Sequence, residues 1–320
     1  MSRRLAVAAV IAALLSAAPA VAAPPEPSAA EEKLSPEDAA KLKQITDLLK
    51  SLKPQTGSVL IPEAKARLAL GEAYYFLGED DARKVLVDLW GNPPEAVEGV
   101  LGMIFPKDAS PAGDTWGAVV TWKGDGYVSD KDAKTTDYDK VLADMRQGEE
   151  QDNQKRQQMG YDTISLVGWA QAPAYDAARH SLIWARELAI GGSQTHGLNY
   201  DVRVLGREGV LSLNIVSSMD RLAEVKAAAQ GVERAAVFEP GARYADYKQG
   251  DRRAAYGVAG LIAAGVGVAA VKKAGMLGLL LLAVKKFGVF ILMGLGAAGT
   301  WIGRQWKRLF GGGRDAADEG

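Results

Sequence analysis

The residues with the richest chemistry in this chain are its two histidines, His180 and His196. A zinc site built on them would need both imidazoles and a carboxylate such as Asp176. His180 stands instead in the stretch DAARHSLIW beside the start of an expected strand, where one structural hydrogen bond would account for it. We therefore expect no bound metal or cofactor, and we keep Asp176 and His180 as a weak candidate for a polar site.

Carboxylates are plentiful, with 39 Asp and Glu residues, but no pair stands apart from helix starts and solvated faces. The chain contains no H-E-x-x-H, no Walker A loop and no G-x-S-x-G, so no catalytic residue can be named from a motif. A carboxylate-dependent hydrolase stays open as an alternative, because a fold can bring two carboxylates together from distant positions.

The hexapeptide GLGAAG, at residues 294–299, has the spacing of a dinucleotide-binding loop. Such a loop needs a strand before it and a helix after it, so that backbone amides meet the pyrophosphate. Here the glycines lie inside a long apolar run with no strand before them. We interpret them as packing glycines of a membrane helix.

Tryptophan is frequent, with seven in the chain, and Trp90 opens the stretch WGNPP. Tryptophan is a preferred anchor of protein interfaces, and Asn92, Pro93 and Pro94 predict a rigid turn after a helix. We expect this turn to be exposed, which makes its residues a candidate interaction surface. The alternative is that the tryptophans simply pack in the core.

Composition limits the function classes further. The formal net charge is −1, so there is no bulk attraction to nucleic acid, and we expect no nucleic-acid partner. The chain has no cysteine, which excludes disulfides, cysteine-ligated metals and thiol nucleophiles. The 48% of hydrophobic residues is enough for a folded core.

The N-terminus has the pattern of a secretory signal peptide over residues 1–22. Two arginines precede an apolar run, and Ala20 and Ala22 have the spacing of a cleavage site. Residues 23–34 are rich in Pro, Ala and Glu and predict a flexible leader. A permanent N-terminal anchor is the alternative, although the apolar run is short for a membrane span.

Residues 35–250 predict an exported α+β domain, an antiparallel sheet layered with helices. Regular alternation of strands and helices is missing, which disfavours a parallel sheet. The polar second half of the helix expected at 136–160 predicts a solvated projection. The strands are expected at 57–61, 64–70, 100–105, 115–122, 163–169, 181–188, 199–205 and 210–216, with a further edge strand at 235–241, and the helices at 35–54, 78–91, 136–160 and 220–229.

The C-terminal part predicts transmembrane helices. Residues 254–271 form an uncharged run of about 27 Å as a helix, close to the thickness of the hydrocarbon core. Residues 287–303 are a second candidate span, and 272–286 are expected to be a cytoplasmic interfacial segment before a polar tail at 304–320. One span followed by a re-entrant stretch is the alternative.

Small residues recur along these predicted spans. In a membrane such residues let two helices approach closely. We expect the helix face that carries the small residues of the first span to pack on the second span or on another protomer. The residues are Ala255, Ala259, Ala263 and Gly267 in the first span, and Gly299 and Gly303 in the second.

Six short stretches, taken in their order along the chain, resemble an uncharacterised bacterial family of membrane-anchored proteins, domain of unknown function 2167. The resemblance begins at about Gly57 and covers most of the chain. It implies an exported domain with C-terminal membrane segments, and it implies no activity. The stretches are FLGEDDARKVLVDLWGNPP, GYVSDKDA, GWAQAPAYDAARHSLIWA, LNYDVRVLGREGVLSLN, FEPGARYADY and AAYGVAGLIAAG.

Together these features predict a membrane-anchored, extracytoplasmic (periplasmic) domain on the inner (cytoplasmic) membrane. Its expected partners are the lipid bilayer and either another membrane protein or a second copy of itself. The favoured function is a non-enzymatic interaction or sensing module of the cell envelope. The alternatives are the carboxylate-dependent hydrolase and a small-ligand-binding domain.

Overall fold

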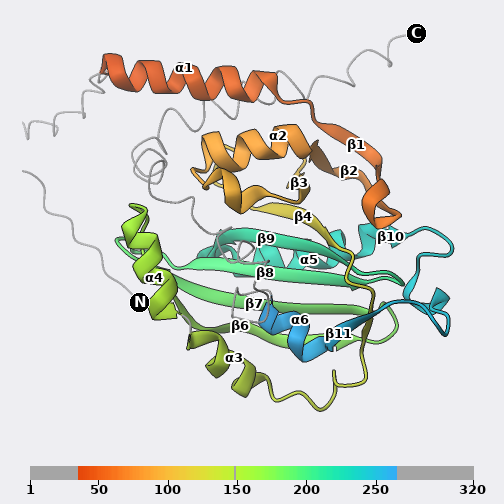
Figure 1. Cartoon of the computed structure of the whole chain (residues 1–320). Helices are drawn as coiled ribbons and strands as arrows, with labels where there is room; N and C mark the ends of the chain where they lie inside the picture. The colour runs from red at the N-terminus through yellow and green to blue at the C-terminus, as the bar shows by residue number, and fades with distance from the viewer. Residues whose placement is uncertain (1–34, 148, 265–320) are drawn as a thin grey trace, which may run out of the picture. The chain divides into compact units, whose positions relative to one another are not determined.

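A large antiparallel sheet dominates the computed structural model, which describes residues 35–147 and 149–264 (Figure 1). Within these residues the strands lie in the order β1-β2-β3-β4-β9-β8-β7-β6, and β10 also pairs with β2. The predicted α+β class with an antiparallel sheet is confirmed. The strands are β1 (Gln55–Ile61), β2 (Ala66–Gly78), β3 (Val100–Pro106), β4 (Gly117–Lys123), β6 (Ile164–Asp176), β7 (Ser181–Ile190), β8 (Gly197–Leu205), β9 (Val210–Ser218) and β10 (Ala236–Phe238).

Two further strands and six α-helices complete the described part. The strands β5 (Tyr127–Ser129) and β11 (Arg253–Gly257) form a separate parallel pair. The helices are α1 (Pro36–Ser51), α2 (Glu79–Lys84), α3 (Tyr138–Arg146), α4 (Glu149–Gln158), α5 (Leu222–Ala235) and α6 (Val258–Ala264). A π-helical turn, Val85–Leu89, continues α2.

One face of the sheet is covered by α5, which lies behind the sheet in Figure 1. Val225 and Val232 of this helix are fully buried against Leu213 and Ile215 of β9. Val225 and Val232 are seven residues apart, which places both on one face of an amphipathic helix. The helix continues to Ala235, beyond residue 229, where we expected it to end. A Cβ on Gly231 would lie 2.3 Å from the Tyr74 hydroxyl, so this glycine permits close packing and does not terminate the helix.

The opposite face carries two separate hydrophobic clusters. The first lies over β2, β3 and β4 and includes Leu86 from the π-helical turn and Met103 from β3. The second lies over β7 and combines α3 and α6 with Leu182 and Trp184. Both clusters bury apolar side chains almost completely, which is where most of the favourable free energy of folding arises.

The polar helix expected to project into solvent has a different role. The predicted helix at 136–160 is two helices, α3 and α4, whose side chains cover the outer edge of β6. Asn153 accepts from the Ile164 amide at 2.7 Å and donates to its carbonyl at 2.9 Å, and Glu149 accepts from the Leu166 amide at 2.6 Å. These bonds occupy backbone groups that an edge strand would otherwise offer to another chain.

The prediction that a membrane helix begins at residue 254 is wrong. Residues up to Gly257 form β11, and helix α6 begins at Val258, whose amide is capped by the Asp132 carboxylate at 2.9 Å. Ala255 is therefore on a strand and cannot share a helix face with Ala259 and Ala263, which are half-buried on α6. The cause is long-range, because β5 pairs with β11 from about 125 residues earlier in the chain.

The side chains of α6 explain why this segment belongs to the domain. Val258, Leu261 and Ile262 are at most 5% exposed, and they pack in the same cluster as Leu182 and Trp184. Within 35–147 and 149–264, no helix is long and apolar enough to cross a membrane. The other calls on the chain ends lie outside these residues, namely the signal peptide, the leader, residues 265–271 with Gly267, the segment 272–286, the second span with Gly299 and Gly303, and the polar tail.

Candidate functional site

Most of the WGNPP turn is buried or half-buried, which contradicts the prediction of an exposed interaction surface. Asn92 is 2% exposed, and its side-chain amide and backbone amide both donate to the Leu86 carbonyl, at 2.8 and 2.9 Å. Pro93 is also buried, although Pro94 is exposed. The indole of Trp90 donates to the Pro111 carbonyl at 3.0 Å. The turn therefore satisfies backbone groups at the end of a π-helical turn, a local need that the sequence pattern did not reveal.

Asp176 and His180 lie in one turn but do not form a pair. The Asp176 carboxylate accepts from the amides of Ala178 and Arg179, at 2.8 and 3.1 Å, and closes the turn between β6 and β7. His180 has a φ of +51°, and its Nδ1 lies 3.2 Å from the Tyr175 hydroxyl. Asp176 is thus a turn residue, which accounts for its type without any chemistry.

The carboxylate that reaches His180 is Asp130, through Tyr175. The Tyr175 hydroxyl donates to Asp130 Oδ2 at 2.7 Å, so His180 Nδ1 is the donor to the phenol oxygen in this assignment. Burial raises the pKa of Tyr175, and its bond to Asp130 raises the pKa further. The phenol therefore stays protonated at neutral pH and links the histidine to the carboxylate.

This histidine and three tyrosines form a stack of four aromatic rings. His180 lies on Tyr244 with ring centres 4.3 Å apart, Tyr244 lies on Tyr127 at 4.4 Å, and Tyr127 lies on Tyr247 at 4.1 Å. Such offset stacks contribute about 0.5–1.5 kcal/mol per pair beyond the burial of area. The stack fastens the segment before β11 to β5 and to the turn between β6 and β7.

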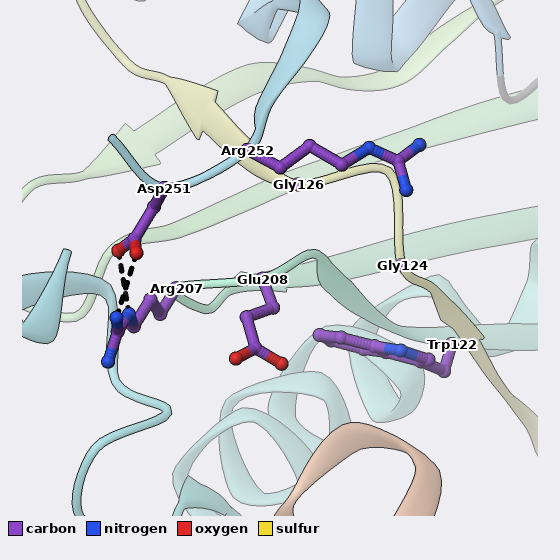
Figure 2. A pocket seen from close by; sticks show the side chains of 7 residues that line it. All are labelled: Trp122, Gly124, Gly126, Arg207, Glu208, Asp251 and Arg252. Atoms are coloured by element: carbon purple, nitrogen blue, oxygen red, sulfur yellow. Dashed lines mark hydrogen bonds and ion pairs between the residues drawn. The ribbon is translucent and has the colours of Figure 1, made fainter. Parts of the chain in front are cut away.

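A hollow of about 320 Å³ opens beside this fastened segment (Figure 2). Its walls come from the end of β4, the loop before β5, the hairpin between β8 and β9, and the residues directly before β11. The sequence GREG, at 206–209 between the strands expected at 199–205 and 210–216, is typical of a hairpin, and the hairpin is confirmed. The lining residues are Trp122, Gly124, Gly126, Arg207, Glu208, Asp251 and Arg252.

Glycines allow the segments of the hollow to meet. Gly126 has a φ of +101°, and a Cβ there would lie 2.6 Å from the Arg252 carbonyl oxygen. Its amide donates to the Glu208 carbonyl at 3.0 Å. A Cβ on Gly209 would lie 2.1 Å from the Lys123 carbonyl oxygen. The three segments are therefore held together by backbone contacts that a larger residue would disrupt.

The charged groups of the hollow are mostly paired. Arg207 forms a two-pronged ion pair with Asp251, at 2.7 and 2.8 Å, and Glu208 binds Lys65 at 2.7 Å. The Arg207 guanidinium, helped by the Lys248 amide, lowers the pKa of Asp251 to about 2. A general acid needs the opposite shift, so Asp251 is unsuited to that role in a hydrolase.

Arg252 is the exception among these charges. Its carbonyl accepts from the Tyr127 amide at 2.9 Å, which fixes the backbone. Its guanidinium is exposed and makes no hydrogen bond or ion pair with any residue that the structure describes. Its charge nevertheless acts on Asp125: burial raises the pKa of this carboxyl, but bonds from Tyr256 and Lys123 and, to a smaller extent, the charge of Arg252 lower the pKa by more. The sequence did not single it out, because one arginine in the run DRRAAY has no distinguishing signal.

A second group of charges lies buried on the sheet, between the two clusters of the α6-bearing face. Asp201 is 0% exposed and accepts from Arg186 at 3.1 Å, from Arg203 at 2.6 Å and from Asn214 at 2.8 Å. Asn199 joins through both Arg186 and Asn214. We call these five residues the buried polar network.

Two directly opposed pairs form the centre of this network, Arg186 with Asn199 across β7 and β8, and Asp201 with Asn214 across β8 and β9. Burial lowers the pKa of Arg186. Three buried N–H groups in or next to the network have no hydrogen-bond partner within the described residues. Groups of this kind commonly bind internal water. The three groups are Trp184 Nε1, Arg186 Nε and Arg203 Nε. In the same part of the chain, no three His, Asp or Glu side chains come together as metal ligands would.

Comparison with known proteins identifies the family and no activity. The solution structure of cyanobacterial PsbP (CyanoP) from Synechocystis has a TM-score of 0.34 and 10% identity to this chain, and the match covers 60% of this chain and 94% of that one. No curated protein matches the chain. A family model described as "Protein of unknown function (DUF2167)" matches residues 53–296. The chain therefore belongs to this family, as its motifs indicated.

Proposed function

We propose that this protein is an extracytoplasmic, membrane-anchored sensing module that binds a small ligand in the hollow of Figure 2 and catalyses no reaction. The domain would face the outside of the inner membrane, with the lipid bilayer as one partner and another membrane protein or a second copy as the other. The signal-peptide pattern at 1–22 and the apolar runs after residue 264 support this placement.

One observation carries the proposal. Asp251 and Arg252 line the hollow and are followed directly by β11 and α6. The Arg252 carbonyl bonds to β5 at 2.9 Å, and Asp132 caps α6, so the segment is held as one unit. A ligand that contacts Arg252 therefore acts on the last described helix before the apolar stretch. A short, rigid connection of this kind is what a sensor needs.

The membrane placement can be tested because the natural chain has no cysteine. Gln194 is exposed in the turn after β7, so Gln194→Cys provides a single thiol on the domain. We expect a membrane-impermeant maleimide to label it in intact cells, with the unsubstituted chain as background. Labelling that requires permeabilised cells would contradict the extracytoplasmic position.

Sensing can be tested by amide hydrogen exchange on the full-length chain. A panel of amino acids, sugar acids and nucleosides is first screened by thermal shift, and a hit must be lost in Trp122→Ala and kept in Arg253→Gln. Arg253 is exposed but does not line the hollow, which makes it a matched control. We expect a hit to slow exchange across residues 253–264. Slower exchange confined to the hollow itself would contradict the sensing route.

A further inference from the structure

We infer that the hollow takes a zwitterionic α-amino acid, with its carboxylate on Arg252, its ammonium on Glu208 and its apolar side chain on Trp122. This rests on the proposed function, because it names the ligand of the same site. The three residues line the same hollow from three separate segments of the chain (Figure 2). Their chemistry differs, so a single ligand would need three different groups to use all of them.

The cationic group available for a ligand is Arg252. Arg207 already uses its guanidinium on both oxygens of Asp251 and on the Gly241 carbonyl. Arg252 has no such partner within the described part of the chain, while its backbone is fixed by β5. A guanidinium on a fixed backbone that makes no hydrogen bond of its own suits a carboxylate, which it can bind through two parallel hydrogen bonds.

The anionic group available for a ligand is Glu208. Asp251 is excluded, because its Oδ1 holds Arg207 and its Oδ2 holds both Arg207 and the Lys248 amide. Glu208 binds Lys65 through Oε2, and its Oε1 has no hydrogen bond to another described residue. An ammonium group can therefore be accepted there without breaking the existing pair.

The third wall is the ring of Trp122. It is half-buried and makes an edge-to-face contact with the ring of Phe238, at a centre-to-centre distance of 5.9 Å. The remaining surface suits an apolar or ring-bearing side chain. The hollow, at about 320 Å³, is at the small end of ligand pockets, which fits a single amino acid better than a nucleotide.

The test uses isothermal titration of the full-length chain in detergent with three probes: L-phenylalanine, N-acetyl-L-phenylalanine and L-phenylalaninamide. We expect L-phenylalanine to bind, and each modification to weaken binding by about tenfold or more, because each removes one charge-assisted hydrogen bond. Arg252→Gln should abolish the preference for the acid over the amide. Glu208→Gln should abolish the preference for the free amine over the acetylated one. Arg253→Gln should bind all three probes as the natural chain does.

The outcomes separate this inference from the proposed function. If Arg252→Gln and Glu208→Gln keep the natural preferences, the assignment of the two charged groups is overturned. If L-phenylalanine does not bind, but another compound of the screening panel binds in a manner that depends on Trp122, the amino-acid inference is overturned and the proposed function stands. If no compound depends on Trp122, both are overturned. Unchanged thermal unfolding of each variant shows that it has folded.

Discussion

The buried polar network and the hollow contain the same ingredients in different surroundings. Each has two arginines, one aspartate and one tryptophan close by. In the network they lie in the middle of a sheet face, and in the hollow they lie on loops at strand ends. The residues are Arg186, Arg203, Asp201 and Trp184 in the network region, and Arg207, Arg252, Asp251 and Trp122 in the hollow.

The two regions differ in whether the second arginine pairs with the aspartate. Asp201 binds both of its arginines, whose side chains are 7% and 11% exposed. Asp251 pairs with one arginine, Arg207, while Arg252 stays exposed and makes no side-chain hydrogen bond or ion pair within residues 35–147 and 149–264. A buried charge without a partner costs several kcal/mol, whereas an exposed one is solvated. The network can therefore only hold the fold together, while the hollow has a charge available for a ligand.

The largest expected effect is the loss of stability when β11 and α6 are removed, because this segment supports both regions. A chain that stops at Arg252 loses β11 and α6, which support the hollow and cover Trp184. Burial of Val258, Leu261 and Ile262 contributes about 5–9 kcal/mol, comparable with the whole stability of a typical domain.

We therefore expect a chain that stops at Arg252 to aggregate or to unfold without cooperativity, and a chain that stops at Ala264 to melt cooperatively. Circular dichroism during heating distinguishes the two. This replaces our expectation from the sequence that the domain ends at residue 250. Equal melting of both chains would mean that α6 is not part of the core.

The next largest effect separates the two aspartates. Asp201→Asn keeps the shape of the side chain but leaves two buried guanidiniums with no counter-charge, which should cost about 3–5 kcal/mol of unfolding free energy. Asp251→Asn changes a partly exposed pair and should cost much less. Urea unfolding of the full-length chain measures both. An equal loss in the two variants would show that burial is not what distinguishes the regions.

Local signals in the sequence predicted much of the fold. The strands at 181–188 and 210–216 were found because apolar and polar residues alternate or cluster there, and GREG marked the turn before β9. The family was recognised from short motifs spread along the chain. These features depend on residues close together in sequence, so no knowledge of the tertiary structure was needed.

The candidate site depends on contacts that are distant in sequence, and this is why it was missed. Asp130 reaches His180 only because β5 lies beside the turn after β6. Arg252 and Trp122 are separated by 130 residues and meet only because β5 pairs with β11. The same pairing places residues 254–257 in a strand, although by composition they belong to the apolar run that predicts a membrane helix.

A smaller effect compares the two tryptophans. Trp184 is fully buried under α6, so Trp184→Phe should leave a gap and cost about 1–3 kcal/mol of unfolding free energy. Trp122 is half-buried, so Trp122→Phe should change stability by less than about 1 kcal/mol. Thermal unfolding and titration with L-phenylalanine give opposite rankings if the comparison holds. Binding should weaken in Trp122→Phe and be kept in Trp184→Phe.

The smallest effect is the acid response of the hollow. The ion pair between Asp251 and Arg207 is the main cause that lowers the pKa of Asp251 from 3.8 to about 2. A carboxyl with a lowered pKa in the folded state contributes stability that is complete above its unfolded pKa and is lost as the pH falls toward the folded pKa. We therefore expect the segment before β11 to loosen between about pH 4 and pH 2, measured as a loss of amide protection, relative to the intrinsic exchange rate at each pH, at Lys248 and Tyr127. In Asp251→Asn this protection should already be low at neutral pH and should not fall further across that window. An unchanged acid response in the variant would mean that another group controls it and that the Arg207 pair does not hold the wall of the hollow.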